Sequence, residues 1–478
     1  MIKFWNTDSC KTEEYGCHVS FTFEDGVRVM RKASLKISME IGKEGGKEGK
    51  PCLTINLGDK KLLTPTIVKR GIATAINEAT KLGLKSAKLC LSGIENELNG
   101  KIVNQVVIGA IVTLSPAYSL KSDKKEHKDD FTLYIANKDG KFTQEAIDES
   151  QNIAEQVLLA REFVNRPPAM KTPKLYAENV EEICKKEGID YTIYDEKYIE
   201  SQKMGAFWAV GSSSGNMPRL VVMRHMGNPS APDDITGFIG KGLTFDTGGY
   251  DLKPSAGMGN MKNDMAGSAA VIAAMVAIKK NNVKANIVAV CPLAENRISR
   301  ESFLQADVLT AMDGTTIQIL STDAEGRLVM SDAMTYAIRE EKVKRVLDIA
   351  TLTGAAVAAF GRYTAATMTN NDDFYNKHKE AAKISGEQYW QMPSNDEYYM
   401  QIENGIADLK NTGGAAAGGG GVMHAGLFME HFAKGLPWIH MDIAGTAFGE
   451  APSHEFHKAG GTGHSVETLY EFAKQLAK

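Results

Sequence analysis

Two acidic side chains two residues apart, Asp323 and Glu325, are the most informative feature of the chain. They lie between the apolar run 317–320, which predicts the end of a strand, and residues 328–338, whose periodicity predicts a helix. On an extended segment, carboxylates at positions i and i+2 point to the same side. Because burying two such acids without a counter-charge costs several kcal/mol, the pattern predicts a bound metal cation.

A second group of charged residues lies around a glycine-punctuated strand pattern. Lys241 and Asp246 flank residues 242–245, and Asp264 precedes residues 268–275, a run of small apolar residues that predicts a helix packed on a sheet. With the first pair of acids, these residues supply four carboxylates, which is the negative charge of two divalent ions. Oxygen ligands without a nearby Cys or His favour Zn, Mn, Mg or Co over a thiolate site.

Two glycine-rich stretches could be taken for phosphate-binding loops, but neither has the full pattern. Lys241 stands where a phosphate loop has its lysine, yet Gly242 replaces the Ser or Thr that the loop requires. Residues 413–421 lack the preceding strand of a dinucleotide-binding motif, and we expect a plain loop there.

The histidines do not complete a metal motif either. His454 and His457 are one residue too close for the H-E-x-x-H zinc motif, which needs four-residue spacing on a helix. His424 and His431 lie seven residues apart on a predicted helix, and we expect them to pack or to lie at the surface rather than to bind a metal.

The two charged motifs resemble those of the leucyl aminopeptidase (cytosol aminopeptidase) family. The first spans residues 240–249 and the second residues 322–328. Further stretches match the family in the same order, over roughly the C-terminal two thirds of the chain, whereas the first 150 residues carry no match. These further stretches are residues 164–168, 172–173, 217–222, 350–355, 406–411 and 441–447.

The resemblance implies a dinuclear-metal aminopeptidase. Such an enzyme removes N-terminal residues, with a preference for Leu- and Met-like side chains, from peptides with a free N-terminus during intracellular peptide turnover. The implied cofactors are two divalent metal ions per chain, Zn or Mn with Mg or Co as further candidates, and a bicarbonate ion. The implied assembly is a homohexamer built as a dimer of trimers.

The resemblance also implies a role for individual residues. Five would bind the metals: Lys241, Asp246, Asp264, Asp323 and Glu325. Two would be catalytic: Lys253, which would stabilise the developing oxyanion, and Arg327, which would hold the bicarbonate. Five would line an apolar substrate pocket: Met261, Thr351, Leu352, Gly354 and Ala447.

The chain departs from the family pattern at two places. Ser321 stands where the family usually has Asn, which is a small polar replacement. Residues 413–418 lack the Arg that the family carries in its Gly-Gly-Arg-x-Ala-Gly stretch. The second departure affects contacts on the substrate side or in the assembly and leaves the predicted metal ligands intact.

Composition limits the class of protein. At 478 residues the chain predicts two or more domains. A net charge of −4 gives no electrostatic drive towards nucleic acid or a membrane. The six cysteines are scattered and fit reduced thiols, the N-terminus shows no secretory signal, and no uninterrupted apolar run could span a membrane. We therefore expect a cytoplasmic protein.

Two other classes of function compete with the aminopeptidase. Some relatives of the family also act as DNA-binding regulators, but the acidic net charge and the absence of a basic arm argue against that role. A scaffold that keeps the fold without catalysis is the second alternative, and the complete set of charged site residues argues against it.

The pattern of the whole chain predicts an α/β protein with two domains. Residues 1–142 would form a small N-terminal α/β domain, residues 143–168 a linker helix, and residues 169–478 a larger catalytic α/β/α domain with a mostly parallel central sheet. Residues 40–50 are expected to form a mobile hairpin loop, and the charge run 121–130 a solvated turn.

Individual elements are predicted from their hydrophobic periodicity. Helices are expected at residues 65–81 and 144–165, the second of which ends before the two prolines 167 and 168. The expected strands are residues 19–23, 53–56, 86–91, 131–135, 219–223, 235–239, 285–290 and 345–349.

Overall fold

A computed structural model of the chain describes residues 16–27, 37–44, 47–91, 94, 98, 101–122, 131–136, 143–414 and 417–477. The chain forms two compact units, each with its own hydrophobic core. The small unit comprises the described residues up to Leu158 together with Lys383–Gly386 and Ala451–Ala459. The large unit comprises Leu159–Ala382, Glu387–Glu450 and the described residues from Gly460 onward.

The small unit is a five-stranded sheet with the order β2-β3-β1-β4-β5. Only the pair β2–β3 is antiparallel. Helix α1 begins at Pro65, where the Thr64 hydroxyl accepts a hydrogen bond from the Ile67 amide, and α1 packs with α2 on the sheet. The elements are β1 (Cys17–Thr22), β2 (Ile37–Glu44), β3 (Lys47–Asn56), η2 (Lys60–Leu62), α1 (Pro65–Lys81), β4 (Ser86–Cys90), α2 (Ile102–Leu114) and β5 (Thr132–Ala136).

The hairpin expected at residues 40–50 is present, but its strands are longer than expected. The backbones of β2 and β3 stay paired up to Glu44 and Lys47, so most of this stretch is strand and not loop. Glycines and charged residues are typical of turns, but antiparallel strands pair through backbone hydrogen bonds, which these residues can also form. Most of the charge run at 121–130 lies outside the described residues.

The large unit is built on a nine-stranded sheet with the order β15-β14-β17-β13-β8-β10-β7-β6, in which β9 also pairs with β10. Strands β8, β9, β10, β13 and β17 run in the same direction, so their carboxyl ends lie at one edge. The strands are β6 (Asp190–Tyr194), β7 (Arg219–Met226), β8 (Ile235–Gly240), β9 (Gly242–Asp246), β10 (Asn286–Asn296), β13 (Arg345–Ala350), β14 (Thr364–Thr369), β15 (Gln388–Gln391) and β17 (Trp438–Asp442).

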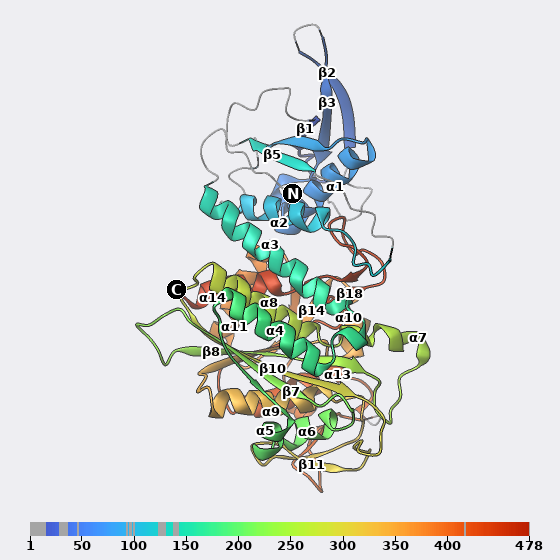
Figure 1. Ribbon diagram of the computed structural model, residues 1–478, viewed down its shortest axis with the longest axis vertical. Helices are drawn as coiled ribbons and strands as arrows, with labels where there is room; N and C mark the ends of the chain where they lie inside the picture. Colours follow the sequence, from blue (N-terminus) through green and yellow to red (C-terminus); the bar gives the residue numbers. More distant parts are fainter. Residues whose placement is uncertain are drawn as a thin grey trace. The chain divides into compact units, whose positions relative to one another are not determined.

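Helices cover both faces of this sheet (Figure 1). One face carries α4 (Pro173–Glu187), α8 (Ala266–Lys280), α11 (Asp372–Ser385) and α14 (Val466–Leu476), and the other carries α5 (Glu196–Ser201), α6 (Gly205–Gly211), α9 (Gly326–Arg339) and α13 (Gly421–Phe432). The mixed α/β architecture with a mostly parallel central sheet is therefore confirmed.

The remaining elements are short or peripheral, apart from α3 (Gln144–Asn165), which belongs to the small unit up to Leu158 and to the large unit beyond it. One small sheet consists of β11 (Val308–Thr310), β12 (Thr316–Gln318) and β16 (Leu409–Lys410). A second one consists of β18 (Phe448–Gly449) and β19 (Gly460–Gly461). The short helices are η4 (Pro168–Met170), α7 (Ser255–Met258), η5 (Gly259–Asn263), α10 (Gly354–Phe360) and α12 (Asp396–Met400).

Small residues allow α8 to approach the sheet closely. A Cβ atom at Gly267 would lie 2.2 Å from the carbonyl oxygen of Ile349 in β13, so only glycine fits there. The helical stretch Ser255–Lys280 is long and apolar enough to cross a membrane, yet 83% of its most apolar window is buried inside the protein, as in a core helix.

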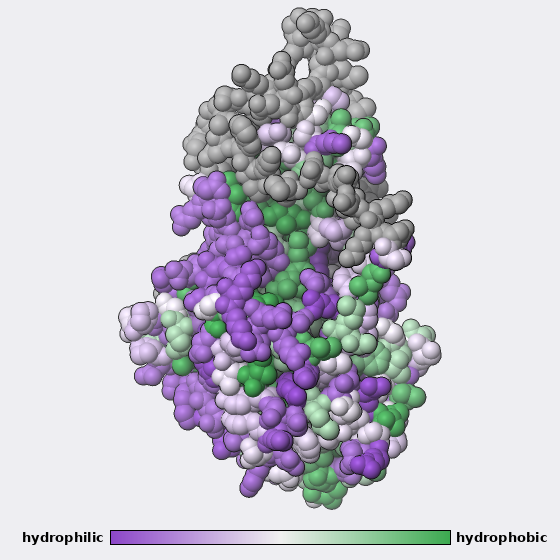
Figure 2. Space-filling model, viewed as in Figure 1, coloured by the Kyte–Doolittle hydropathy of each residue, from purple (hydrophilic) through white to green (hydrophobic). Residues whose placement is uncertain are grey.

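The described cysteines, Cys17, Cys52, Cys90, Cys184 and Cys291, form no disulfide with one another. Figure 2 shows hydrophilic residues gathered over α3 and α4 on the outer face of the molecule. On α4, Lys174 and Lys185 pair with Glu178 and Glu181 one helical turn away, so this face is a solvated one.

Candidate metal centre

The candidate site lies at the edge of the central sheet where the parallel strands end. Lys241 follows β8, Asp246 is the last residue of β9, and Thr351 follows β13. Parallel strands bring their carboxyl ends to one edge, and this brings together residues about a hundred positions apart in the sequence.

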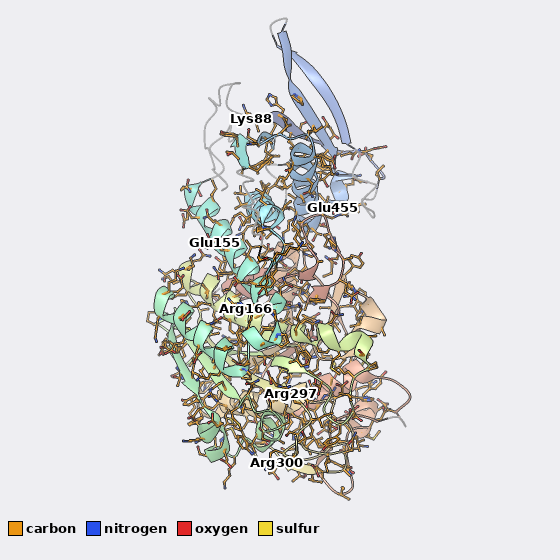
Figure 3. All side chains as sticks on the ribbon, turned by 45° about the vertical axis from the view of Figure 1, so that its right-hand side comes forward. Lys88, Glu155, Arg166, Arg297, Arg300 and Glu455 are labelled. Carbon is orange, nitrogen blue, oxygen red and sulfur yellow. The ribbon has the colours of Figure 1, made fainter. Side chains whose placement is uncertain are left out.

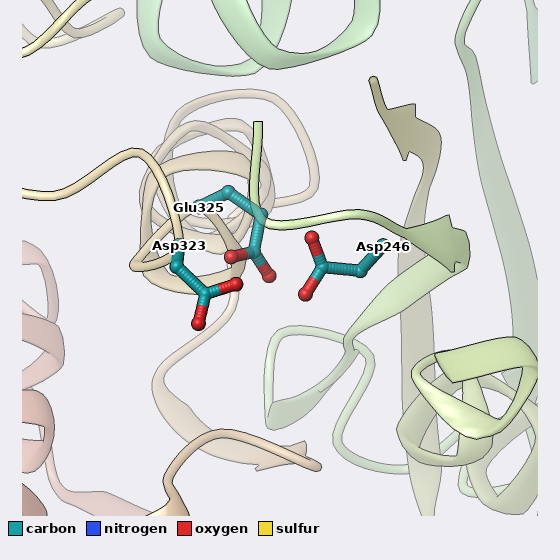
Figure 4. A group of neighbouring side chains, drawn as sticks. All are labelled: Asp246, Asp323 and Glu325. Atoms are coloured by element: carbon teal, nitrogen blue, oxygen red, sulfur yellow. The ribbon is translucent and has the colours of Figure 1, made fainter. Parts of the chain in front are cut away.

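Three carboxylates form the centre of the site (Figure 4). One oxygen atom from each of Asp246, Asp323 and Glu325 lies within 4.8 Å of the others. Asp246 and Glu325 are buried, with 2% and 1% of their surface exposed, whereas the Asp323 side chain is 35% exposed. The fourth predicted acid, Asp264, is 4% exposed and reaches this group through Lys241.

Two lysines lie between the carboxylates. Lys253 Nζ is 2.8 Å from Asp246 Oδ2 and also contacts Asp323. Lys241 Nζ is 2.8 Å from Asp264 Oδ2 and 2.9 Å from Glu325 Oε1, and it donates to the Thr351 carbonyl oxygen at 3.0 Å. When all four acids are ionised, four carboxylates against two ammonium groups leave a net charge of −2, which favours binding of cations.

The pKa values of three of the acids are raised, as expected where acids are buried and negative charges are crowded together. Burial raises the pKa of Asp246 and Asp264, and neighbouring acids add to this effect. Burial, together with Glu325 and Asp246, raises the pKa of Asp323 to about 7. A cation bound among these groups would relieve that repulsion, so the donor set fits divalent metal ions with oxygen ligands.

The same crowding of acids stabilises the charged form of the buried lysine. Burial alone would lower the pKa of Lys241, but Asp264 and Glu325 outweigh burial and raise it above its ordinary value. Burial likewise opposes ionisation of Glu325, whereas Lys241 and Lys253 lower its pKa. Both lysines are therefore ammonium groups in this arrangement, and Lys241 would have to lose its proton before it could bind a metal.

The path of the chain through Asp323 differs from the expected extended segment, and that expectation is wrong. Strand β12 belongs to a small sheet with β11 and β16 and is not part of the central sheet. Asp323 lies in a turn, and Glu325 has the helical angles φ −82° and ψ −32° at the start of α9. The two carboxylates converge because the chain turns into a helix and not because of strand alternation.

Arg327 lies in the first turn of α9 and is 5% exposed. Its Nη1 donates to the Asn411 carbonyl oxygen at 2.7 Å, while its buried Nε has no hydrogen-bond partner among the described residues. Burial lowers the pKa of Arg327 to about 10, so the guanidinium remains charged at neutral pH. A buried cationic N–H without a partner fits a small anion such as bicarbonate.

Four of the five predicted substrate residues lie on segments next to the acids. The Thr351 hydroxyl donates to Asp264 Oδ1 at 2.8 Å, and Leu352 and Gly354 follow in the same loop at the start of α10. Met261 is in η5, and its carbonyl accepts a hydrogen bond from the Asp264 amide. Ala447 is 3% exposed and bonds through its backbone to Ile443 and Thr462 rather than to the acids.

Several supporting residues were not recognised from the sequence. Asp442, at the end of β17, accepts hydrogen bonds from the Leu352 amide and the Thr353 hydroxyl and so holds the loop after β13. Asn411 accepts from the Leu320 and Ser321 amides before the turn that carries Asp323. Both residues lie in stretches that match the family motifs, so the sequence marked their positions but did not indicate what they do. Asn296 and Asp251, which also bond to these loops, gave no signal.

The histidines on α13 have ordinary packing partners. His424 Nε2 lies 2.7 Å from Gln401 Oε1, and His431 lies 3.0 Å from the Tyr399 hydroxyl. These contacts agree with the expectation that the two rings pack rather than bind a metal.

Comparisons with known proteins match the chain over most of its length. Residues 158–470 match the family model described as the cytosol aminopeptidase family, catalytic domain. The chain is 41% identical to a probable cytosol aminopeptidase of Clostridium perfringens, over 89% of this chain and 86% of that protein. It is 38% identical to one from Alkaliphilus metalliredigens, over 90% and 86% of the two chains.

A solved structure is similar over nearly the whole chain. The bottromycin maturation enzyme BotP in complex with Mn superposes with a TM-score of 0.84 at 27% identity, covering 97% of this chain and 100% of that one. The similarity therefore includes the small unit, for which the sequence motifs gave no match.

Proposed function

Because the chain belongs to the cytosol aminopeptidase family of metal-dependent exopeptidases, we propose that it is a dinuclear-metal aminopeptidase. Its substrates are peptides with a free N-terminus, from which it removes the first residue. The observation that carries the proposal is the group of Asp246, Asp323 and Glu325: one oxygen of each lies within 4.8 Å of the others, and with Asp264 the carboxylates outnumber the nearby lysines.

The metal-binding residues in this proposal are Lys241, Asp246, Asp264, Asp323 and Glu325. Carboxylate oxygens suit Zn or Mn, with Mg or Co as further candidates, and the related BotP structure contains Mn. Two ions bound there would lower the pKa of a water molecule towards neutrality and polarise the scissile carbonyl.

Lys253 is the cation available to a developing oxyanion. Its side chain is 18% exposed, and its ammonium lies between Asp246 and Asp323. Burial opposes its charge, yet Asp246 and Glu325 outweigh burial and raise its pKa, which favours the charged ammonium in the metal-free protein. A tetrahedral intermediate formed at this point would accept a hydrogen bond from Lys253.

Arg327 is the proposed binding site for bicarbonate. Its unpartnered Nε–H and its charge support this role, and the chemistry that the anion supplies is that of a general base. The Asn411 carbonyl accepts a hydrogen bond from Nη1 and so holds one side of the guanidinium.

Specificity is proposed to come from an apolar pocket for the first side chain of the peptide. Its residues would be Met261, Thr351, Leu352, Gly354 and Ala447. An apolar pocket distinguishes side chains that differ by one methylene by only about 1–3 kcal/mol. We therefore expect broad specificity with a preference for Leu and Met.

Hydrolysis of Leu-p-nitroanilide tests the aminopeptidase function. Cleavage is expected, and the N-acetylated substrate should resist cleavage because it has no free amine. Di- and tripeptides with an N-terminal Leu or Met should likewise be cleaved from that end. Equal turnover of the free and the acetylated substrate would contradict an exopeptidase.

We further propose a cytoplasmic homohexamer, a dimer of trimers that encloses the sites and serves peptide turnover. We also propose that the chain has three functional parts: an N-terminal domain (1–142), a linker helix (143–168) and the catalytic domain (169–478). Light scattering should give a mass near six chains of 51.9 kDa each, and folded proteins should resist digestion. A fully active monomer would contradict the need for assembly.

A further inference from the structure

Asn296 is a buried amide at the edge of the metal centre with no role in the mechanism so far. It is the last residue of β10 and 0% exposed. The pairing between β9 and β10 shifts register between Ala294 and Glu295, and this irregularity brings Asn296 opposite Asp246. The next residue, Arg297, is labelled in Figure 3.

The amide of Asn296 touches both segments that carry the clustered acids. Its Nδ2 donates to Asp246 Oδ1 at 2.8 Å and to the carbonyl oxygen of Thr322, the residue before Asp323, at 3.0 Å. Both partners can only accept hydrogen bonds, so the orientation of the amide is fixed by their chemistry.

These contacts distinguish the two oxygens of Asp246. Oδ1 accepts from Asn296 and from the Gly248 amide, both at 2.8 Å, while Oδ2 faces Lys253 at 2.8 Å. The donors on Oδ1 fix the plane of the carboxylate and leave Oδ2 pointing into the cluster. A ligand held in this way does not have to be ordered when a cation binds.

The backbone of Asn296 strengthens the same connection. Its carbonyl oxygen accepts hydrogen bonds from both the amide and the hydroxyl of Thr247, each at 2.9 Å. One residue therefore holds the loop that follows β9 and the turn that carries Asp323 at a fixed separation.

We propose that Asn296 is a positioning residue for the metal centre, which sets the orientation of the Asp246 carboxylate and its distance from Asp323. The proposal rests on the proposed function, because it concerns metal ligands assigned there. Outer-shell partners of this kind typically contribute about 10- to 100-fold to metal affinity or activity.

Asn296→Leu tests the proposal, because leucine keeps the branched shape and removes both donated hydrogen bonds. Asn296→Ala is the second variant, in case the larger side chain prevents folding. Asn286 offers a matched control at the other end of β10: it is 3% exposed, and its Nδ2 donates to the Ala231 carbonyl at 2.7 Å, away from the acids. The same two substitutions are made there.

The measurements are titration of metal-free protein with Co²⁺, the visible spectrum of the Co²⁺ form, and kcat and KM for Leu-p-nitroanilide. Both Asn296 variants are expected to bind Co²⁺ about 10- to 100-fold more weakly, with an altered spectrum and a lower kcat but little change in KM. The Asn286 variants are expected to match the wild type in spectrum and metal affinity.

Unchanged Co²⁺ affinity, spectrum and kcat in the Asn296 variants would overturn the proposal while leaving the proposed function intact. Failure of both Asn296 variants to fold, with the Asn286 variants folded, would also overturn it, because Asn296 would then serve the fold alone. A wild-type protein that binds no Co²⁺ and cleaves no substrate would instead contradict the proposed function itself.

Discussion

Glu325→Ala is expected to lose both bound metal and activity, whereas Arg327→Ala is expected to keep its metal and lose only part of its activity. Glu325 is 1% exposed and belongs to the three-carboxylate group, so its removal takes a ligand from the centre of the site. The Arg327 guanidinium bonds to the Asn411 carbonyl and to none of the acids. Its loss removes only the proposed seat of an anion.

The two losses should differ in size. Removal of one preorganised charge-stabilising group typically costs about 100- to 1,000-fold in rate, and we expect Glu325→Ala to reach at least the upper end of this range because metal is lost as well. For Arg327→Ala we expect about 10- to 100-fold, since the other groups around the reacting carbonyl remain. Excess bicarbonate should partly restore the rate of that variant only.

Metal analysis and kcat/KM for both variants measure this difference. Unfolding is not expected to explain the loss in Glu325→Ala, because Lys241 keeps its contacts with Asp264 and the Thr351 carbonyl. The melting temperature of each metal-free variant controls for stability. Two metal ions per chain in dialysed Glu325→Ala would contradict the proposed role of this residue.

Lys241→Met is expected to have the largest effect on stability. The ammonium lies 2.8 Å from Asp264 and 2.9 Å from Glu325 inside the protein. Removing one partner of a buried ion pair leaves an uncompensated charge and costs about 3–5 kcal/mol in the free energy of unfolding. A bound metal would mask the effect, so it should appear in the metal-free protein.

The loss of stability in Lys241→Met should depend on pH, and the direction of this dependence follows from the pKa shifts. Burial and the neighbouring acids already raise the pKa of Asp264, and without Lys241 it should rise further. The pKa of Glu325, which Lys241 and Lys253 lower in the wild type, should rise as well. Acids whose pKa is higher in the folded than in the unfolded state favour folding less as pH rises through that interval. Lys241→Met should therefore lose most stability at pH 8 and less at pH 6.

Urea unfolding of the metal-free proteins at both pH values measures the effect. Lys253→Met is the matched control: its ammonium also contacts two of the acids, but its side chain is 18% exposed, against 4% for Lys241, so a smaller loss is expected. Equal stability of Lys241→Met and the wild type at both pH values would contradict the structural role of the buried ammonium.

The regular elements were the most predictable part of the fold, because their patterns are local. Helix α1 has Thr and Pro at its start, and α3 ends before two prolines, so both helices could be delimited from the sequence. The buried parallel strands appeared as short apolar runs between turn residues. A hairpin was expected at residues 40–50, but the extent of the β2–β3 pairing was not, because it depends on backbone hydrogen bonds and not on an apolar side-chain pattern.

The candidate site was predictable where its residues fall in compact motifs. Lys241 and Asp246 lie around one strand, and Asp323 and Glu325 precede one helix, so each pair falls within one motif that resembles the family. Their supports were not predictable in the same way. Asn296 lies 50 residues from Asp246 in the chain, and its hydrogen bond joins the ends of two neighbouring strands, which leaves no periodic signal. The turn at Asp323 depends likewise on distant Asn411.

Metal titration of the stripped enzyme tests the central claim most directly. Chelation followed by dialysis should abolish hydrolysis of Leu-p-nitroanilide, and addition of Mn, Zn or Co should restore it as two ions bind per chain. Binding should weaken as pH falls through about 7, the pKa to which burial and neighbouring acids raise Asp323. Unchanged hydrolysis by protein shown to be free of metal would contradict the account.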